Sequence, residues 1–114
     1  MTAKTFDKGV NRGTVNLVLD AVTSATDSDA FYTHPYETVT VYSAVSGNTG
    51  AVTFTVEASP TGEFSGEEIT LDSRTSTATN ETYSYSYKEG HVYMRVTTST
   101  HSNATVTAYI CGRS

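Results

Sequence analysis

The sequence predicts an all-β protein, an antiparallel β-sandwich of about seven or eight short strands with an N-terminal arm. Runs of alternating apolar and polar residues recur at spacings of about 8–12 residues, with turn-forming residues between them. Threonine, whose branched side chain suits the solvent-facing side of a strand, occurs 22 times, and tyrosine occurs eight times. The chain has two prolines and no convincing helical period. This pattern fits a jelly roll and an immunoglobulin-like fold equally well.

The 114 residues divide into an arm at 1–13 and one β-sandwich domain at 14–114. The arm has no hydrophobic period and carries three of the seven basic residues. It is either a frayed terminus or a segment that docks on a partner. The sequence shows no secretory signal and no apolar run long enough for a membrane span, so we expect synthesis in a cytosol.

The first predicted strand covers residues 14–22. Its apolar residues Val15, Leu17 and Leu19 share one face, and Val18 adds an apolar side chain to the other face. Neighbouring elements can therefore cover both faces of this strand.

A short strand or corner over residues 30–33 precedes the clearest signal in the chain, at residues 39–58. There, two alternating runs, V-T-V-Y-S-A-V-S and A-V-T-F-T-V-E-A, flank the tetrapeptide G-N-T-G. Glycine supplies the positive φ angles of a tight reversal, so the stretch predicts a hairpin. Its inward-facing residues are Val39, Val41, Val45, Val52, Phe54, Val56 and Ala58.

The second half of the chain continues the same pattern. Further strands are predicted at residues 67–72, 81–87, 91–98 and 104–111, and the polar residues 73–80 form a loop or an exposed edge. Predicted inward-facing residues are Ile69, Leu71, Val92, Met94, Val96, Val106, Ala108 and Ile110. Tyr83, Tyr85 and Tyr87 share one face of a strand, where they either cover the core or form a protein- or carbohydrate-binding surface.

Charge and residue spacing argue against several functions. The net charge of −5 disfavours nucleic acid and anionic membranes as partners, since both attract Lys and Arg. The segment Asp27-Ser28-Asp29 lacks the other ligand positions of a calcium loop, and the three histidines are not spaced for one metal ion. The chain contains no G-x-S-x-G motif, and its single cysteine, Cys111, is either a small buried residue or an exposed thiol. We therefore expect no enzyme activity, no cofactor and no metal.

Several short motifs resemble those of small structural proteins of tailed bacteriophages. They are T-V-T-V-Y at 38–42, V-T-F-T-V-E-A-S at 52–59, G-H-V-Y-M-R-V at 90–96 and A-T-V-T-A-Y-I at 104–110. The segment L-V-L-D-A-V-T at 17–23 is similar to the N-terminal strands of these proteins, and S-P-T-G at 59–62 stands where they often carry S-x-D-G. The resemblance extends over about residues 14–112.

The resemblance implies a virion protein that is assembled in the host cytoplasm and has no catalytic residues. It would be a capsid decoration, or cement, protein that binds the capsid exterior, stabilises the shell and forms a homo-oligomer. Its partners would be the major capsid protein or other virion proteins. The alternatives are a neck or tail accessory protein and a receptor- or carbohydrate-binding module on a tail or fibre. The residues expected to bind the capsid or another partner are Lys4, Phe6, Lys8, Arg12, Tyr83, Tyr85 and Tyr87.

Overall fold

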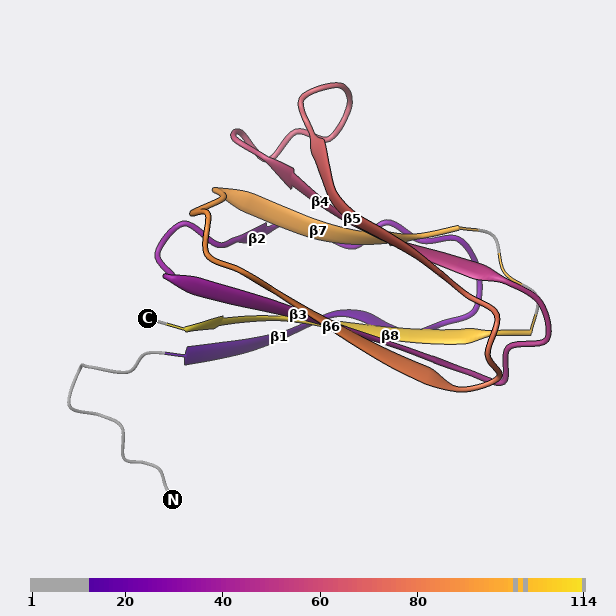
Figure 1. Ribbon diagram of the computed structural model, residues 1–114. Coiled ribbons are helices and arrows are strands. Elements are labelled where there is room, and N and C mark those ends of the chain that lie inside the picture. Colours follow the sequence, from indigo (N-terminus) through magenta and orange to yellow (C-terminus); the bar gives the residue numbers. More distant parts are fainter. Residues whose placement is uncertain (1–12, 100, 102, 114) are drawn as a thin grey trace, which may run out of the picture.

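The computed structural model describes residues 13–99, 101 and 103–113, in which eight strands form two four-stranded antiparallel sheets (Figure 1). The strands are β1 (Gly13–Val22), β2 (Phe31–Tyr32), β3 (Thr38–Ser46), β4 (Val52–Ser59), β5 (Ile69–Ser76), β6 (Glu81–Tyr87), β7 (Tyr93–Thr98) and β8 (Thr105–Arg113). The predicted all-β sandwich is confirmed. In this part of the chain, no helix has the length and apolar character needed to cross a membrane.

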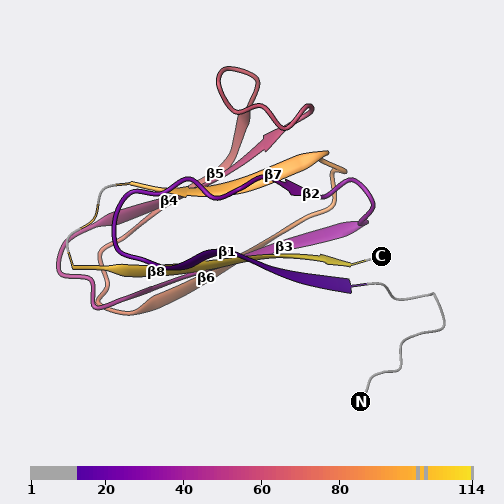
Figure 2. The same ribbon diagram turned by 180° about the vertical axis from the view of Figure 1, so that it is seen from behind.

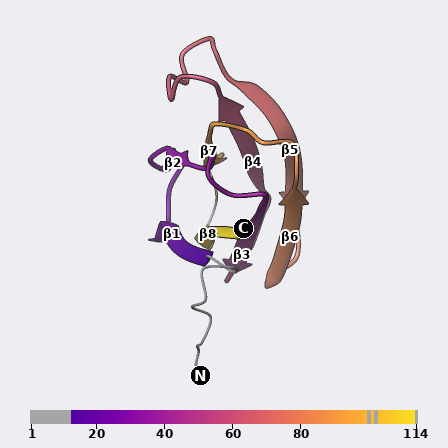
Figure 3. The same cartoon turned by 90° about the vertical axis from the view of Figure 1, so that its left-hand side faces the viewer.

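One sheet has the order β1-β8-β3-β6 and the other has the order β2-β7-β4-β5. Figure 3 shows the two sheets as stacked layers with their strands in these orders. The first strand pairs with the last, β2 with β7, β3 with β6 and β4 with β5, always antiparallel. The chain is thus one long hairpin rolled onto itself, which is the jelly-roll form of the β-sandwich.

The tip of this long hairpin is the connection between β4 and β5, which projects beyond its sheet (Figure 1). The hairpin predicted over residues 39–58 is wrong, because β3 pairs with β6 and β8 whereas β4 pairs with β5 and β7. Both runs do alternate, and both bury one face. The G-N-T-G reversal carries the chain from one sheet to the other, so the two apolar faces oppose each other across the core.

Asn48 fixes this crossing between the sheets. Its side chain is buried, and Nδ2 donates hydrogen bonds of 3.1 Å to the carbonyl oxygens of both Ser76 and Ala78. Its Oδ1 accepts a hydrogen bond of 3.1 Å from the Gly50 amide. Gly47 enters the crossing with a φ of +65°, a conformation that favours glycine. The crossing is therefore bonded to the segment that joins β5 to β6.

The core lies between the sheets, and valine is its commonest residue. Its buried apolar residues are Leu19, Val39, Val41, Val45, Val52, Phe54, Val56, Ala58, Tyr87, Met94, Val96, Ala104, Val106, Ala108 and Ile110. The inward faces predicted for residues 39–58 and for β8 are confirmed by this set. Ile69 was predicted to face inward and is 56% exposed, since it begins an edge strand at the open end of the sandwich.

The first strand contains the bulge that decides where its apolar residues point. Leu17 pairs with Tyr109, whereas Leu19 pairs with Ala108, so one extra residue is inserted between them. As a result Leu19 is buried, while Leu17 and Val15 lie on the outer side of the sheet. The prediction that all three share one face is therefore wrong. Figure 2 shows β1 beside β8 at the edge of this sheet.

We predict that Asn48→Ala lowers the free energy of unfolding by about 1–3 kcal/mol, because it leaves two inward-facing carbonyl oxygens without their donor. Urea denaturation measures this loss. Asn80→Ala is the matched control. Asn80 is exposed, and its Oδ1 accepts one hydrogen bond of 3.3 Å from the Gly47 amide, so we expect a loss below about 1 kcal/mol. Equal losses in the two variants would contradict the role given to Asn48.

Candidate functional site

The outer side of the β1-β8-β3-β6 sheet exposes a row of large side chains. Leu17 pairs with Tyr109, Tyr109 with Tyr42, and Tyr42 with Ser84, so these four residues cross the sheet in register. Leu17, Tyr42 and Tyr109 are 44%, 43% and 38% exposed, and Val15 in the next row is 71% exposed. A contiguous group of this kind on a monomer is a sign of an interaction site.

The same side of the sheet carries no carboxylate on β3, β6 and β8 or on β1 before its bulge. Its outward residues are Gly13, Val15, Leu17, Thr38, Thr40, Tyr42, Ala44, Ser46, Thr82, Ser84, Ser86, Thr105, Thr107, Tyr109, Cys111 and Arg113, which we call the carboxylate-free face. Eleven of the twelve Asp and Glu residues belong to the described part of the chain. Asp20, exposed on β1 after the bulge, borders this face beside Thr107, and the other ten lie elsewhere. A protein with a net charge of −5 thus has one broad area without negative side chains.

The carboxylate-free face has a ridge and two hollows. Tyr42 and Tyr109 lie side by side on β3 and β8 and form the ridge. On one side is a hollow of about 700 Å³, whose lining includes Val15, Thr40 and Cys111. On the other side is a hollow of about 250 Å³, whose lining includes Ala44, Thr82 and Thr107.

Hydroxyl groups and one thiol line the larger hollow. The hydroxyl groups of Thr40 and Ser86 are hydrogen-bonded at 3.0 Å. Cys111 is half-buried, and this burial raises the pKa of its thiol. The thiol is therefore less ionised than a free one at neutral pH, which makes it a weak nucleophile.

The tyrosines predicted to bind a partner lie on the inner side of β6. Tyr83 packs edge-on against Phe54 at 5.8 Å between ring centroids. The Arg74 guanidinium lies 4.5 Å from the centroid of Tyr83 and 5.0 Å from that of Tyr85. These contacts join the edge strands β5 and β6, which belong to different sheets. A cation placed over two rings stabilises this open side of the sandwich.

Tyr87 is buried, and its hydroxyl donates a hydrogen bond to the Asp72 carboxylate. Burial, together with this bond, raises the pKa of Tyr87 well above its ordinary value. The structure thus places the three tyrosines in contacts within the molecule, and their contact with a partner stays a prediction. The arm residues Lys4, Phe6, Lys8 and Arg12 lie outside the described residues.

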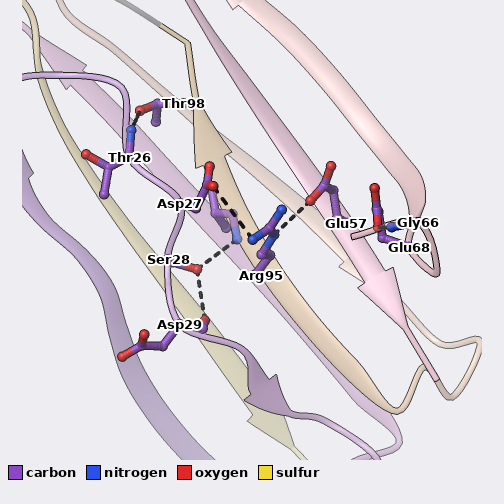
Figure 4. Close-up of polar contacts among 10 residues, drawn as sticks. Thr26, Asp27, Ser28, Asp29, Glu57, Gly66, Glu68, Arg95 and Thr98 are labelled. Carbon is purple, nitrogen blue, oxygen red and sulfur yellow. Dashed lines mark hydrogen bonds and ion pairs between the residues drawn. The ribbon is translucent and has the colours of Figure 1, made fainter. Parts of the chain in front are cut away.

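On the other sheet, Arg95 connects three separate segments. Its Nε donates a hydrogen bond of 2.8 Å to Glu57, and its terminal nitrogen lies 3.8 Å from the Asp27 carboxylate (Figure 4). The guanidinium also lies 4.4 Å from the centroid of the Phe64 ring. The Asp27 loop is further fixed by a bond of 3.0 Å from the Val96 amide to the Ser28 hydroxyl. Asp27, which the sequence left without a calcium-loop partner set, therefore has a structural contact with Arg95.

A second aromatic group lies on this sheet, in which Tyr32 and His34 are exposed and Tyr93 is half-buried. The rings of Tyr32 and Tyr93 are 5.2 Å apart, and that of His34 lies 6.0 Å from Tyr32. His101 is buried elsewhere, with Nδ1 2.9 Å from the Ala104 carbonyl oxygen. No group of three or more His, Cys, Asp or Glu residues in the described ranges is placed to hold a metal ion.

Sequence reasoning missed the carboxylate-free face, although part of its signal was present. Tyr109 follows the alternation that places Ala108 and Ile110 inward, so its outward position was predictable. The alignment of Tyr109 with Leu17 and Tyr42 depends on strand pairing and on the β1 bulge. Neither is encoded in the period of a single strand.

The fold and this face define a jelly-roll sandwich that presents a partly apolar sheet surface without carboxylates. No family model and no curated protein sequence matches the chain. Solved structures with a similar fold include the SPBc2 prophage-derived protein YomS, with a TM-score of 0.68 at 17% identity over 96% of this chain and 100% of that one. Murine APRIL has a TM-score of 0.51 at 11% identity over 87% and 98% of the two chains.

A protein of the disulfide-linked pili that form Bacillus endospore appendages has a TM-score of 0.50 at 14% identity, over 99% of this chain and 96% of that one. At these identities the likenesses show the fold alone. The fold is thus one that a prophage-derived protein, a murine protein and a pilus subunit all adopt.

We predict that the free energy of unfolding falls as the pH rises above about 10, the ordinary pKa of tyrosine. The raised pKa of Tyr87 keeps it neutral in the folded state, whereas unfolded chains lose the proton. The stabilisation is therefore complete below pH 10 and is lost above it. Tyr87→Phe should lose about 1 kcal/mol at neutral pH and show a shallower alkaline decline in urea titrations. Tyr32→Phe, at an exposed position, should behave like the unmodified protein, and an unchanged slope in Tyr87→Phe would contradict the assignment.

Proposed function

We propose that this protein is a non-catalytic structural component of a bacteriophage virion, assembled in the host cytoplasm, which binds the capsid exterior and stabilises the shell. The carboxylate-free face is the observation that carries the structural role, because it offers a surface for contact with another protein chain, while the contact with the capsid itself is given to the basic arm. A decoration protein acts by burying area and positioning hydrogen bonds, and the centres of protein interfaces are poor in charge and rich in tyrosine. The exposed row of Leu17, Tyr42 and Tyr109 has this composition.

The fold supports the same proposal. The similarity to the prophage-derived protein YomS covers the whole length of that chain and nearly all of this one. The sequence motifs resemble phage structural proteins over the same range. Both observations agree with a small domain that forms part of a larger assembly.

Capsid binding is assigned in this proposal to the basic arm. Lys4, Lys8 and Arg12 belong to the arm, whereas the rest of the chain contains eleven of the twelve carboxylates. The arm is therefore the part of the chain with the opposite charge to the whole, and it suits an acidic patch on a capsid subunit. Phe6 adds one large apolar side chain to the same segment.

The test uses phage particles produced with and without this protein. We predict that purified particles carry the protein in a fixed ratio to the major capsid protein and release DNA at a higher temperature than particles without it. The triple change of Lys4, Lys8 and Arg12 to alanine should lower occupancy at least about tenfold, and Lys88→Ala is the matched control. Purified heads that lack the protein would contradict the proposal, and occupancy on isolated tails alone would assign it to a neck or tail role.

A carbohydrate-binding module is the second candidate, because the exposed rings of Tyr32 and His34 and the half-buried ring of Tyr93 form an aromatic group on the other sheet. Aromatic faces of this kind suit stacking against sugar rings. A glycan array would show binding that Tyr93→Ala removes and Tyr109→Ala keeps. An array without binding would reject this candidate and leave the structural proposal in place.

A further inference from the structure

We infer that the carboxylate-free face binds a second copy of this chain, as a face-to-face dimer with two-fold symmetry. The inference deepens the proposed structural function and rests on it for its biological setting. The charge, the shape and the area of the face all favour such a contact.

Charge decides which surface of one copy can approach another. Each copy has a net charge of −5, and bringing its acidic surfaces together costs free energy through like-charge repulsion. The carboxylate-free face reduces this cost, because none of its outward residues is acidic and Arg113 is its one charged side chain. A single carboxylate, that of Asp20 after the β1 bulge, borders it. Among the broad surfaces of the described strands, it is the one on which two copies meet without opposing carboxylates.

The shape of the face is complementary to itself. The ridge formed by Tyr42 and Tyr109 lies next to the larger hollow, whose lining includes Val15, Thr40 and Cys111. A two-fold axis that runs across the strands, between the row of Tyr109 and the row of Cys111, places the ridge of each copy in the hollow of the other. Such an isologous contact uses the same patch twice and closes after two copies. The tyrosine rings then lie against aliphatic and hydroxyl groups, an environment that tyrosine favours.

The area of the face sets the expected affinity. Four strands about 4.8 Å apart, with up to nine residues of about 3.4 Å each, cover roughly 500 Å² per copy, or about 1,000 Å² for the pair. Specific stable interfaces bury about 1,200–2,000 Å², and weaker ones less. We therefore expect a reversible dimer that dissociates on dilution and becomes stable when copies are held together on a larger particle.

Sedimentation of the full chain tests the inference. We expect a concentration-dependent monomer–dimer equilibrium, which Tyr109→Asp weakens at least about tenfold because it buries an unpaired charge. Tyr32→Asp is the matched control, since Tyr32 is a tyrosine of similar exposure on the other sheet, and it should leave the equilibrium unchanged. Ser84→Arg is a second variant, at an exposed position in the same row as Tyr42, in case Tyr109→Asp does not fold.

The single cysteine reports which face is used. Cys111 lies in the larger hollow, about 7 Å along β8 from Tyr109. Its alkylation by N-ethylmaleimide should slow as the protein concentration rises, and Tyr109→Asp should abolish this protection. In the dimer described above, the two Cys111 Cα atoms are about 12 Å apart, from a sheet separation of about 10 Å and an offset of about 7 Å. No disulfide should therefore form between copies, since its Cα atoms must lie within about 7 Å.

A chain that stays monomeric at every concentration, or a dimer that Tyr32→Asp disrupts and Tyr109→Asp does not, would overturn the inference. Removal of residues 1–12 could instead abolish the dimer while Tyr109→Asp has no effect on it. That result would assign the association to the arm and would also overturn the inference. Occupancy on phage heads separates the two proposals. Heads that carry the unmodified protein as isolated monomers would contradict the dimer and keep the capsid function. A dimer that forms in solution but never binds heads would keep the dimer and contradict the capsid function.

Discussion

The antiparallel pairing of the two halves of the chain is the constraint on which the rest of the structure depends. The first strand lies beside the last, and each later strand pairs with the corresponding earlier one until the chain reverses between β4 and β5. Rolling this long hairpin places every inward-facing residue in one core and joins β3 to β8 and β4 to β7. Most contacts therefore join residues far apart in sequence, so we expect slow folding for a domain of this size.

The same pairing separates the tyrosines into two sets with different environments. Tyr83, Tyr85 and Tyr87 face the interior, where they contact an arginine, a phenylalanine and a carboxylate that stabilise the open side between the sheets. Tyr42 and Tyr109 face outward, in a row without negative charge. The proposed contact with a second copy depends on this outer set, while the inner set contributes to the stability of the sandwich.

Alternation along the chain was sufficient to predict the strands and most of the core. Val106, Ala108 and Ile110 are buried as predicted, because the period of two fixes which side chains share a face. Pairing was not predictable in this way, since G-N-T-G fits a hairpin as well as a crossing between sheets. The crossing depends on the bonds of Asn48 with the segment after β5, which lies about thirty residues further along the chain.

The candidate site was harder to predict than the fold. Val15, Leu17 and Leu19 stand two residues apart, so alternation alone places all three on one face of the strand. The bulge in β1 turns Val15 and Leu17 outward, and a one-residue bulge leaves no trace in the composition of the chain. A tyrosine on an alternating strand can face the core or a binding surface. The alternation at residues 83–87 therefore does not show which of the two these tyrosines face. Only strand order shows that Tyr42, Tyr109 and Leu17 lie together on one surface.

The most direct measurement of the central claim is chemical modification of the eight tyrosines, read by mass spectrometry in the free and assembled states. In the dilute protein, Tyr32, Tyr42 and Tyr109 should react first, because their rings are the most exposed of the described tyrosines. In the assembled protein, Tyr42 and Tyr109 should become protected while Tyr32 stays reactive. Equal reactivity of Tyr42 and Tyr109 in both states would contradict the claim that the carboxylate-free face is the interaction surface.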